Sequence, residues 1–160
     1  MLSYRTEVDV PALRSREVYD FLRTCDDQRY HLWWPGTHLS FHTVSGPPGE
    51  VGSVVFMDER IGTFRLTARG VVRKLVPDRE LVVQLTWAGV PLPAWLTLSF
   101  EDTAEGVRIV HELALFFRGA GRVLDRLLAR LALPADFEQQ LAGHAREEFA
   151  RLGQLLHPRA

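Results

Sequence analysis

The sequence predicts an α+β fold in which a curved antiparallel sheet of six to seven strands wraps around one long C-terminal helix. Short strand-like segments separated by turn residues fill most of residues 39–117. Residues 136–156 instead carry apolar side chains at helical spacing. One short helix near the N-terminus cannot cover so large a sheet, so the C-terminal helix must pack on its apolar face.

The C-terminal helix is predicted from Asp136 to Leu156. Asp136 follows a proline and forms a capping box with Gln139. The apolar stripe of this helix consists of Leu141, Ala145, Phe149, Leu152 and Leu156, with Phe137 and Leu155 at its edge. Glu148 lies inside this stripe and His144 lies on its margin, four residues earlier, so both side chains point toward the buried side.

The remaining elements follow from alternation and turn residues. Residues 3–10 alternate and end at Pro11, which indicates an edge strand. Ser15 is a candidate N-cap for a short helix that closes at residues 24–27. Residues 30–38 form an aromatic turn that is too irregular for either period. Strands are then expected at residues 39–44, 51–60, 64–76, 81–88, 95–101 and 107–117.

A second amphipathic segment is predicted from Gly119 to Leu133. Its leucines lie beside Arg122, Arg126 and Arg130, which are spaced four residues apart. Such an arginine row indicates either docking on a membrane surface or the solvated face of an ordinary packed helix. We favour the solvated face because it is the commoner arrangement.

The composition limits the classes of partner. A chain of 160 residues with 46% hydrophobic residues suits a single domain over residues 1–160. The net charge of -1 and the lack of a basic block argue against nucleic acid. Cys25 is the single cysteine, the N-terminus has no signal-like run, and no stretch is apolar enough for a transmembrane helix. We expect a cytoplasmic protein that binds a hydrophobic or aromatic small molecule, and the composition leaves a homodimer open.

Strand parity indicates which side chains share the inner face of the sheet. Glu59 falls in the more apolar row of its strand, and His111 falls in an otherwise apolar row of the last strand. The expected substrate contacts are Trp33, Trp34, Met57, Phe64, Leu85, Trp87 and Leu141. An isolated carboxylate on such a wall is costly, so Glu59 and Glu148 each need a histidine or a cation as partner.

The order of elements resembles the Bet v1-like or START-like helix-grip fold of the polyketide cyclase/lipid-transfer (SRPBCC) superfamily. The resemblance covers the whole chain. It implies a cavity between the sheet and the last helix, which is a natural site for a hydrophobic ligand. The fold alone does not give the activity, because it hosts both ligand carriers and enzymes.

Two histidines and two carboxylates together form a candidate metal site. His38, Glu59, His144 and Glu148 come from a turn, a strand and one face of a helix, and their nitrogen and oxygen donors suit zinc. Each residue has an ordinary explanation when it is taken singly, such as a surface ion pair for His144 and Glu148. The combination is more informative, since all four are expected to face the same cavity.

The segment from Tyr30 to His38, which reads YHLWWPGTH, is similar to a signature of the diacetylphloroglucinol hydrolase family. That family is a zinc-dependent branch of this fold, and it cleaves a carbon–carbon bond in acylated phenols. Tyr30, Leu32, Trp33, Pro35 and His38 carry the similarity.

The resemblance implies that His38, Glu59, His144 and Glu148 bind zinc. It also implies that Tyr30 lies near the phenol group of the substrate. The chain departs from the family in being much shorter and in having Phe41 where a polar substrate contact is expected.

The function expected from this resemblance is metal-dependent hydrolysis of an aromatic, acylphenol-type molecule, with Tyr30 or His111 as general acid or base. Two alternatives remain open. The first is a metal-free carrier or sensor of a hydrophobic small molecule, in which His144 and Glu148 only pair with each other. The second is a polyketide cyclase, in which Tyr30, His111 and the cavity shape steer ring closure without a metal.

Overall fold

The computed structural model describes residues 2–115 and 133–158. Its elements are β1 (Leu2–Pro11), α1 (Ser15–Arg23), α2 (Asp27–Trp33), β2 (His38–Ser45), β3 (Val54–Ile61), β4 (Phe64–Val76), β5 (Glu80–Trp87), β6 (Val90–Asp102), β7 (Gly106–Leu115) and α4 (Phe137–Leu156). Most of the predicted amphipathic segment 119–133 and the end of the predicted last strand lie outside the described residues.

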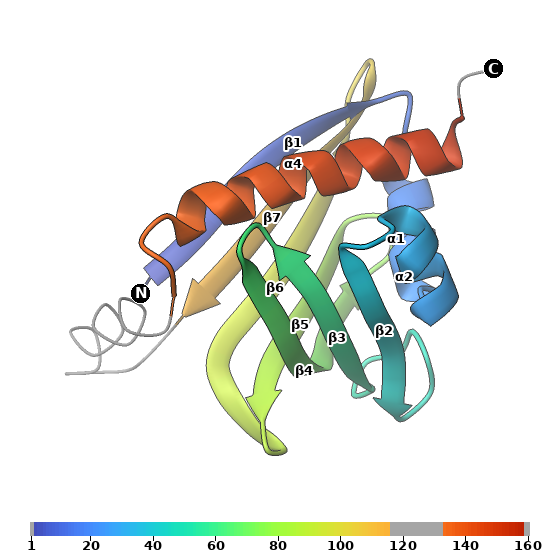
Figure 1. The fold of residues 1–160 in the computed structure, drawn as a ribbon. Helices are drawn as coiled ribbons and strands as arrows, with labels where there is room; N and C mark the ends of the chain where they lie inside the picture. The colour runs from blue at the N-terminus through green and yellow to red at the C-terminus, as the bar shows by residue number, and fades with distance from the viewer. Residues whose placement is uncertain (1, 116–132, 159–160) are drawn as a thin grey trace.

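Seven antiparallel strands form one sheet in the order β1-β7-β6-β5-β4-β3-β2. Strands β2 to β7 pair with their neighbours in sequence, and β1 joins the sheet beside β7. Figure 1 shows the curved sheet, with α4 running across it and α1 and α2 together at one end. The predicted α+β architecture, the C-terminal helix and the edge position of the first strand are therefore confirmed.

The apolar stripe of α4 is buried as predicted. Phe149 and Leu152 pack with Val10 and Ile109, which come from the two strands at the β1 edge of the sheet. The buried residues of α4 are Phe137, Leu141, His144, Ala145, Glu148, Phe149 and Leu152. Burying several large apolar side chains, at about 1.5–3 kcal/mol each, is sufficient to hold the helix on the sheet.

The helix caps differ from the prediction. Asp136 occupies the N-cap position of α4, but its side chain accepts no capping hydrogen bond, so the predicted capping box with Gln139 is wrong. The backbone of Asp136 has φ -102° and ψ 17° instead of the extended conformation that aims a capping side chain at the first turn. In α1 the N-cap is Arg14, and Ser15 is already the first helical residue.

Helix α2 forms where the sequence predicted an irregular aromatic turn. The Asp26 side chain caps it by accepting a hydrogen bond of 2.8 Å from the backbone N–H of Arg29. Seven residues span only two turns, which is too short for a clear helical period. The helix turns Tyr30 and Trp33 inward, and both are buried.

Two strand boundaries also differ. β3 begins at Val54 because residues 51–53 belong to the preceding turn. β6 begins at Val90, before Pro91 and Pro93, whereas the sequence predicts this strand only from residue 95. Pro91 pairs with Thr86 next to an irregularity in the β5–β6 ladder, where a residue without a backbone N–H is tolerated.

The two-residue turn between β3 and β4 attaches the sheet to α4. Gln140 Oε1 accepts hydrogen bonds from the backbone N–H of Thr63 (2.8 Å) and from its hydroxyl (3.1 Å). A Cβ atom on Gly62 would lie only 2.3 Å from this oxygen, and Gly62 has a φ of +58°. Gln140 precedes His144 by about one helical turn, so this contact places His144 above the end of β3.

Candidate metal centre and cavity

His38, Glu59, His144 and Glu148 converge on one point, and we call them the four-residue cluster. His38 is the first residue of β2, and Glu59 is its partner across the β2–β3 ladder. His144 and Glu148 lie one turn apart on α4. All four side chains are buried, and one ligand atom from each lies within 4.8 Å of the others.

The distances within the cluster suit a common ligand. His38 Nε2 lies 3.3 Å from Glu148 Oε1 and 3.7 Å from Glu59 Oε2. His144 Nε2 lies 3.2 Å from Glu59 Oε2 and 4.0 Å from Glu148 Oε2. Ligand atoms at about 2.0–2.1 Å from a tetrahedral zinc ion are separated from one another by about 3.3 Å. Small side-chain movements therefore suffice to reach coordination distances.

The environment of the His38 ring favours the binding of a cation. It is completely buried, and neither of its nitrogens has a hydrogen-bond partner within the described residues. A buried polar group without a partner costs about 1–3 kcal/mol. Because Nε2 faces both carboxylates, a cation among these atoms would satisfy this nitrogen and both acids. The donors present thus fit a borderline divalent metal such as zinc.

The charges of the cluster are coupled. Burial raises the pKa of the Glu59 carboxyl, but the hydrogen bond and charge of His144, the charge of His38 and the Tyr30 hydroxyl hold that pKa below its ordinary value. Burial lowers the pKa of His144, but the hydrogen bond to Glu59 and the charges of Glu148 and Glu59 raise it above the usual range. The Glu59 carboxyl is thus held in the ionised form that binds a cation.

Tyr30 supports two members of the cluster. Its hydroxyl donates a hydrogen bond of 2.9 Å to Glu59 Oε2, and its ring stacks on His38 at a centroid distance of 4.0 Å. Burial, followed by the charges of Glu59 and Glu148, raises the pKa of Tyr30 well above its ordinary value. The hydroxyl therefore keeps its proton and orients Glu59, although the resemblance assigned it to the substrate phenol.

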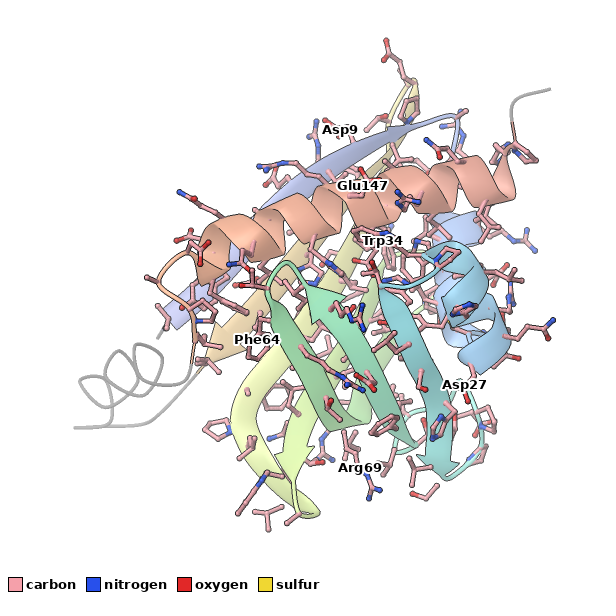
Figure 2. The ribbon with its side chains drawn as sticks, viewed as in Figure 1. Asp9, Asp27, Trp34, Phe64, Arg69 and Glu147 are labelled. Carbon is pink, nitrogen blue, oxygen red and sulfur yellow. The ribbon has the colours of Figure 1, made fainter. Side chains whose placement is uncertain are left out.

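Trp34 covers the outer side of His144. The centroid of its indole lies 4.9 Å from that of the His144 ring, and the two rings are stacked. The guanidinium of Arg151, a residue of α4, lies 5.1 Å from the indole centroid. Figure 2 shows Trp34 where the segment after α2 meets α4. Trp34 is not among the residues that line the cavity, so its position indicates a shield over the cluster.

A mostly apolar cavity adjoins the cluster between the sheet and α4. The centre of a water molecule can occupy about 110 Å³ of this space. Its wall includes the predicted residues Tyr30, Trp33, Met57, His111 and Leu141, together with Glu59, His144 and Glu148. His111 Nδ1 is buried and has no hydrogen-bond partner within the described residues, and burial lowers the pKa of the ring.

Besides Trp34, three further predicted wall residues lie outside the cavity wall. Phe64 packs edge-on against Phe137, at 5.7 Å between ring centroids. Leu85 and Trp87 do not line the cavity, and Trp87 is 74% exposed beside the turn that follows β5. The ladder between β5 and β6 is irregular between Gln84 and Thr86, and such a shift ends the alternation on which the prediction relied.

Several wall residues were missed by sequence reasoning. Leu22, Arg23 and Cys25 reach the cavity from the end of α1 and the loop after it. No local pattern marks these positions, because only the packing of α1 against the sheet brings them to the cavity. Gln140 was also missed, although its spacing of four residues from His144 places it on the same helical face.

Solved structures share the fold of this chain. The Bet v1-type allergen Ara h 8.0201 matches with a TM-score of 0.64 over 99% of both chains, at 12% identity. The KanY protein matches with a TM-score of 0.64 over 97% of both chains, at 10% identity. The chain has the Bet v1-like helix-grip fold. DynU16, a protein in the dynemicin biosynthetic locus, matches this helix-grip fold with a TM-score of 0.51 at 18% identity, over 89% of this chain and 46% of DynU16.

These similarities show the helix-grip fold and not an activity. No family model and no curated protein matches the sequence. Among the helices in residues 2–115 and 133–158, none is long and apolar enough to span a membrane.

Proposed function

We propose that the protein is a metal-dependent hydrolase that holds zinc in the four-residue cluster and acts on an aromatic, acylphenol-type molecule in the adjoining cavity. The observation that carries the proposal is His38, whose buried Nε2 faces two carboxylates without a hydrogen-bond partner in the described chain. The similarity of the Tyr30–His38 segment to the zinc-dependent hydrolases supports the same four ligands. A bound zinc ion supplies Lewis acidity toward a carbonyl and lowers the pKa of a water molecule that it holds.

The two carboxylates have different roles in this proposal. Glu59 is fixed by the Tyr30 hydroxyl and by His144. The Glu148 carboxylate accepts no hydrogen bond from the described residues, although His38 and His144 lie within 4.0 Å. Glu148 is therefore the ligand that would shift more easily to open a coordination position for water or substrate.

His111 is the proposed proton carrier. It reaches the cavity from β7, and its Nδ1 is free of other partners in the described residues. Hydrolysis of an aryl ketone adds the hydroxyl of water to the acyl carbon, breaks the bond to the ring and places a proton on the ring carbon. A neutral imidazole accepts and returns such a proton at neutral pH.

The walls suit an aromatic ring. Trp33, Phe41 and Phe149 line the cavity beside the cluster, and further along it Val55, Val72 and Val83 provide aliphatic surface. Flat aromatic side chains hold a ring by offset or edge contacts, and apolar walls exclude water.

Metal content tests the site directly. Protein purified without added metal is expected to hold stoichiometric zinc by elemental analysis, and His144→Ala and Glu148→Ala are each expected to lose it while keeping their circular dichroism spectra. His42→Ala is the matched control, since His42 is exposed and pairs with Asp27 away from the cavity. Retention of stoichiometric zinc by either cluster variant would overturn the site.

Activity requires a second measurement. Release of the acid from acylated phenols is expected with the wild type and is expected to stop on chelation. His111→Gln is expected to keep its zinc and to lose at least about a hundredfold in turnover, in line with general acid–base catalysis. Unchanged turnover in this variant would remove His111 from the mechanism.

The largely apolar wall also favours a second candidate, a metal-free carrier of a hydrophobic small molecule. In that case His144 and Glu148 only pair with each other. A lipid or polyketide extracted from zinc-free protein would support the carrier. Cyclisation of a polyketone in the presence of a chelator would instead support a polyketide cyclase.

A further inference from the structure

Arg23 adds a cationic residue to the lining of a mostly apolar cavity. It is the last residue of α1 and the only arginine or lysine among the lining residues. Its guanidinium forms no hydrogen bond or ion pair with any residue of 2–115 or 133–158. Arg16 and Arg29, its neighbours on α1 and α2, instead contact Asp20 and Phe21.

Arg23 lies at the end of the cavity opposite the four-residue cluster. Thr43 pairs with Val55, and Val55 lies four positions before Glu59 on β3. At about 3.3 Å per residue, this is a distance of about 13 Å along the strand. Arg23 lies against Gly49, which is in the turn between β2 and β3. A Cβ atom added to Gly49 would lie 2.6 Å from the Arg23 carbonyl oxygen.

Arg23 also marks the open end. The lining residues around the cluster are buried, whereas Arg23 is exposed and Leu22, Cys25 and Gly49 are partly exposed. The cavity therefore runs from a buried polar end, past apolar walls, to a cation at the solvent. A ligand that fills it meets each of these surfaces in turn.

We propose that Arg23 is an anion subsite at the mouth of the cavity, and that the natural ligand is an apolar molecule with a carboxylate at the end remote from the group that meets the cluster. This proposal rests on the cavity being the ligand site and adds a charge requirement to it. Arginine binds carboxylates through charge-assisted, often bidentate hydrogen bonds, and the partly apolar surroundings reduce screening.

A purely structural role for Arg23 makes a different prediction. A cation in the last turn of a helix stabilises that helix by interacting with its C-terminal dipole. Its loss would then lower stability and would weaken every cavity ligand equally. Selective loss of anionic ligands distinguishes the subsite from this role.

Two fluorescent probes of closely similar shape supply the test. Anilinonaphthalene sulfonate carries an anionic group, and phenylnaphthylamine lacks it. In the zinc-loaded wild type, both probes are expected to bind and to displace each other. Arg23→Gln is expected to raise the Kd of the sulfonate about tenfold and to leave that of the neutral probe within about twofold. The sulfonate Kd should also lose part of its salt dependence in this variant.

Arg16→Gln is the matched control, because it removes the same charge from the exposed side of the same helix. An equal effect of the two variants on sulfonate binding would overturn the subsite, as would equal weakening of both probes by Arg23→Gln. Failure of the wild type to bind either probe would instead contradict the cavity itself, and loss of zinc alone would contradict only the metal site.

Discussion

The indole Nε1 of Trp33 donates a hydrogen bond of 2.7 Å to the backbone carbonyl of Glu148. This bond joins α2 to α4 at a residue that supplies a candidate metal ligand. The same indole packs edge-on against His38, at a centroid distance of 4.7 Å. One buried side chain therefore contacts the cluster from both the helix side and the sheet side.

Trp33→Phe is expected to lower the free energy of unfolding by about 1–3 kcal/mol, because the Glu148 carbonyl loses its side-chain donor and a smaller ring fills the space. Zinc affinity is expected to fall about tenfold, as for other changes to residues that orient metal ligands. Urea unfolding and competition with a chelator measure the two effects. Trp87→Phe, at an exposed position, should change neither.

Tyr30→Phe distinguishes the role of the Tyr30 hydroxyl from that of the Tyr30 ring. The variant keeps an aromatic ring to stack on His38 and loses the hydrogen bond to Glu59. Zinc affinity is expected to fall about 10- to 100-fold with little change in fold. Tyr4→Phe is the control, since Tyr4 packs on Phe137 and is not among the lining residues of the cavity. An affinity equal to that of the wild type would show that Tyr30 does not orient Glu59.

Gly62→Ala tests the contact between the β3–β4 turn and α4. The added Cβ would displace Gln140, so the free energy of unfolding is expected to fall by about 1–3 kcal/mol and zinc binding to weaken. Urea unfolding and chelator competition report both.

Gly89→Ala isolates the effect of backbone strain in that experiment. Gly89 also has a positive φ in a turn between strands, but an added Cβ there has no neighbour within 4 Å. This variant should show a smaller loss of stability and normal zinc binding. If the two alanine variants bind zinc equally well, the Gln140 contact does not position His144.

Asp102 is expected to make stability depend on pH. Its Oδ1 accepts a hydrogen bond of 2.7 Å from the backbone N–H of Ser15, and this bond is the main cause that lowers the pKa of the carboxyl below its ordinary value. A lowered folded-state pKa gives stability that is present above the unfolded-state pKa of about 3.9 and is lost as the pH falls through the folded-state pKa.

Asp102→Asn should therefore destabilise the protein at pH 7, by less than about 1 kcal/mol because the group is exposed, and the difference from the wild type should shrink below about pH 4. Urea unfolding at a series of pH values measures it, with Glu105→Gln as the exposed control. A difference that grows on acidification would contradict the assigned cause.

The sequence predicted those features that depend on regular periods. The apolar stripe of α4 faces the sheet as predicted, and Glu59 and His111 face the cavity as the alternation in their strands predicted. Helix and strand geometry fix where each of these side chains points. His144 and Glu148 share a helical face for the same reason. These regularities account for the positions of Glu59, His144 and Glu148 on the cavity wall, whereas His38 was placed by the resemblance of the Tyr30–His38 segment.

Irregular features were not predictable in this way. The ladder shift in β5 ends the row that would have carried Leu85 and Trp87 into the cavity. Helix α2 is too short to show a period, and Asp136 has a cap-type side chain but not the backbone angles of a cap. Arg23 reaches the cavity only through the packing of α1 against the β2–β3 turn, which no local pattern reveals.

The ligands of the cluster are widely separated along the chain, since Glu59 and His144 are 85 positions apart. During synthesis, His38 and Glu59 leave the ribosome first, on the β2–β3 hairpin. His144 and Glu148 follow only after all seven described strands have been made. Contacts of such large sequence separation form late in folding. Metal capture would thus report completion of the fold, and a chain that stops before α4 would have no competent centre.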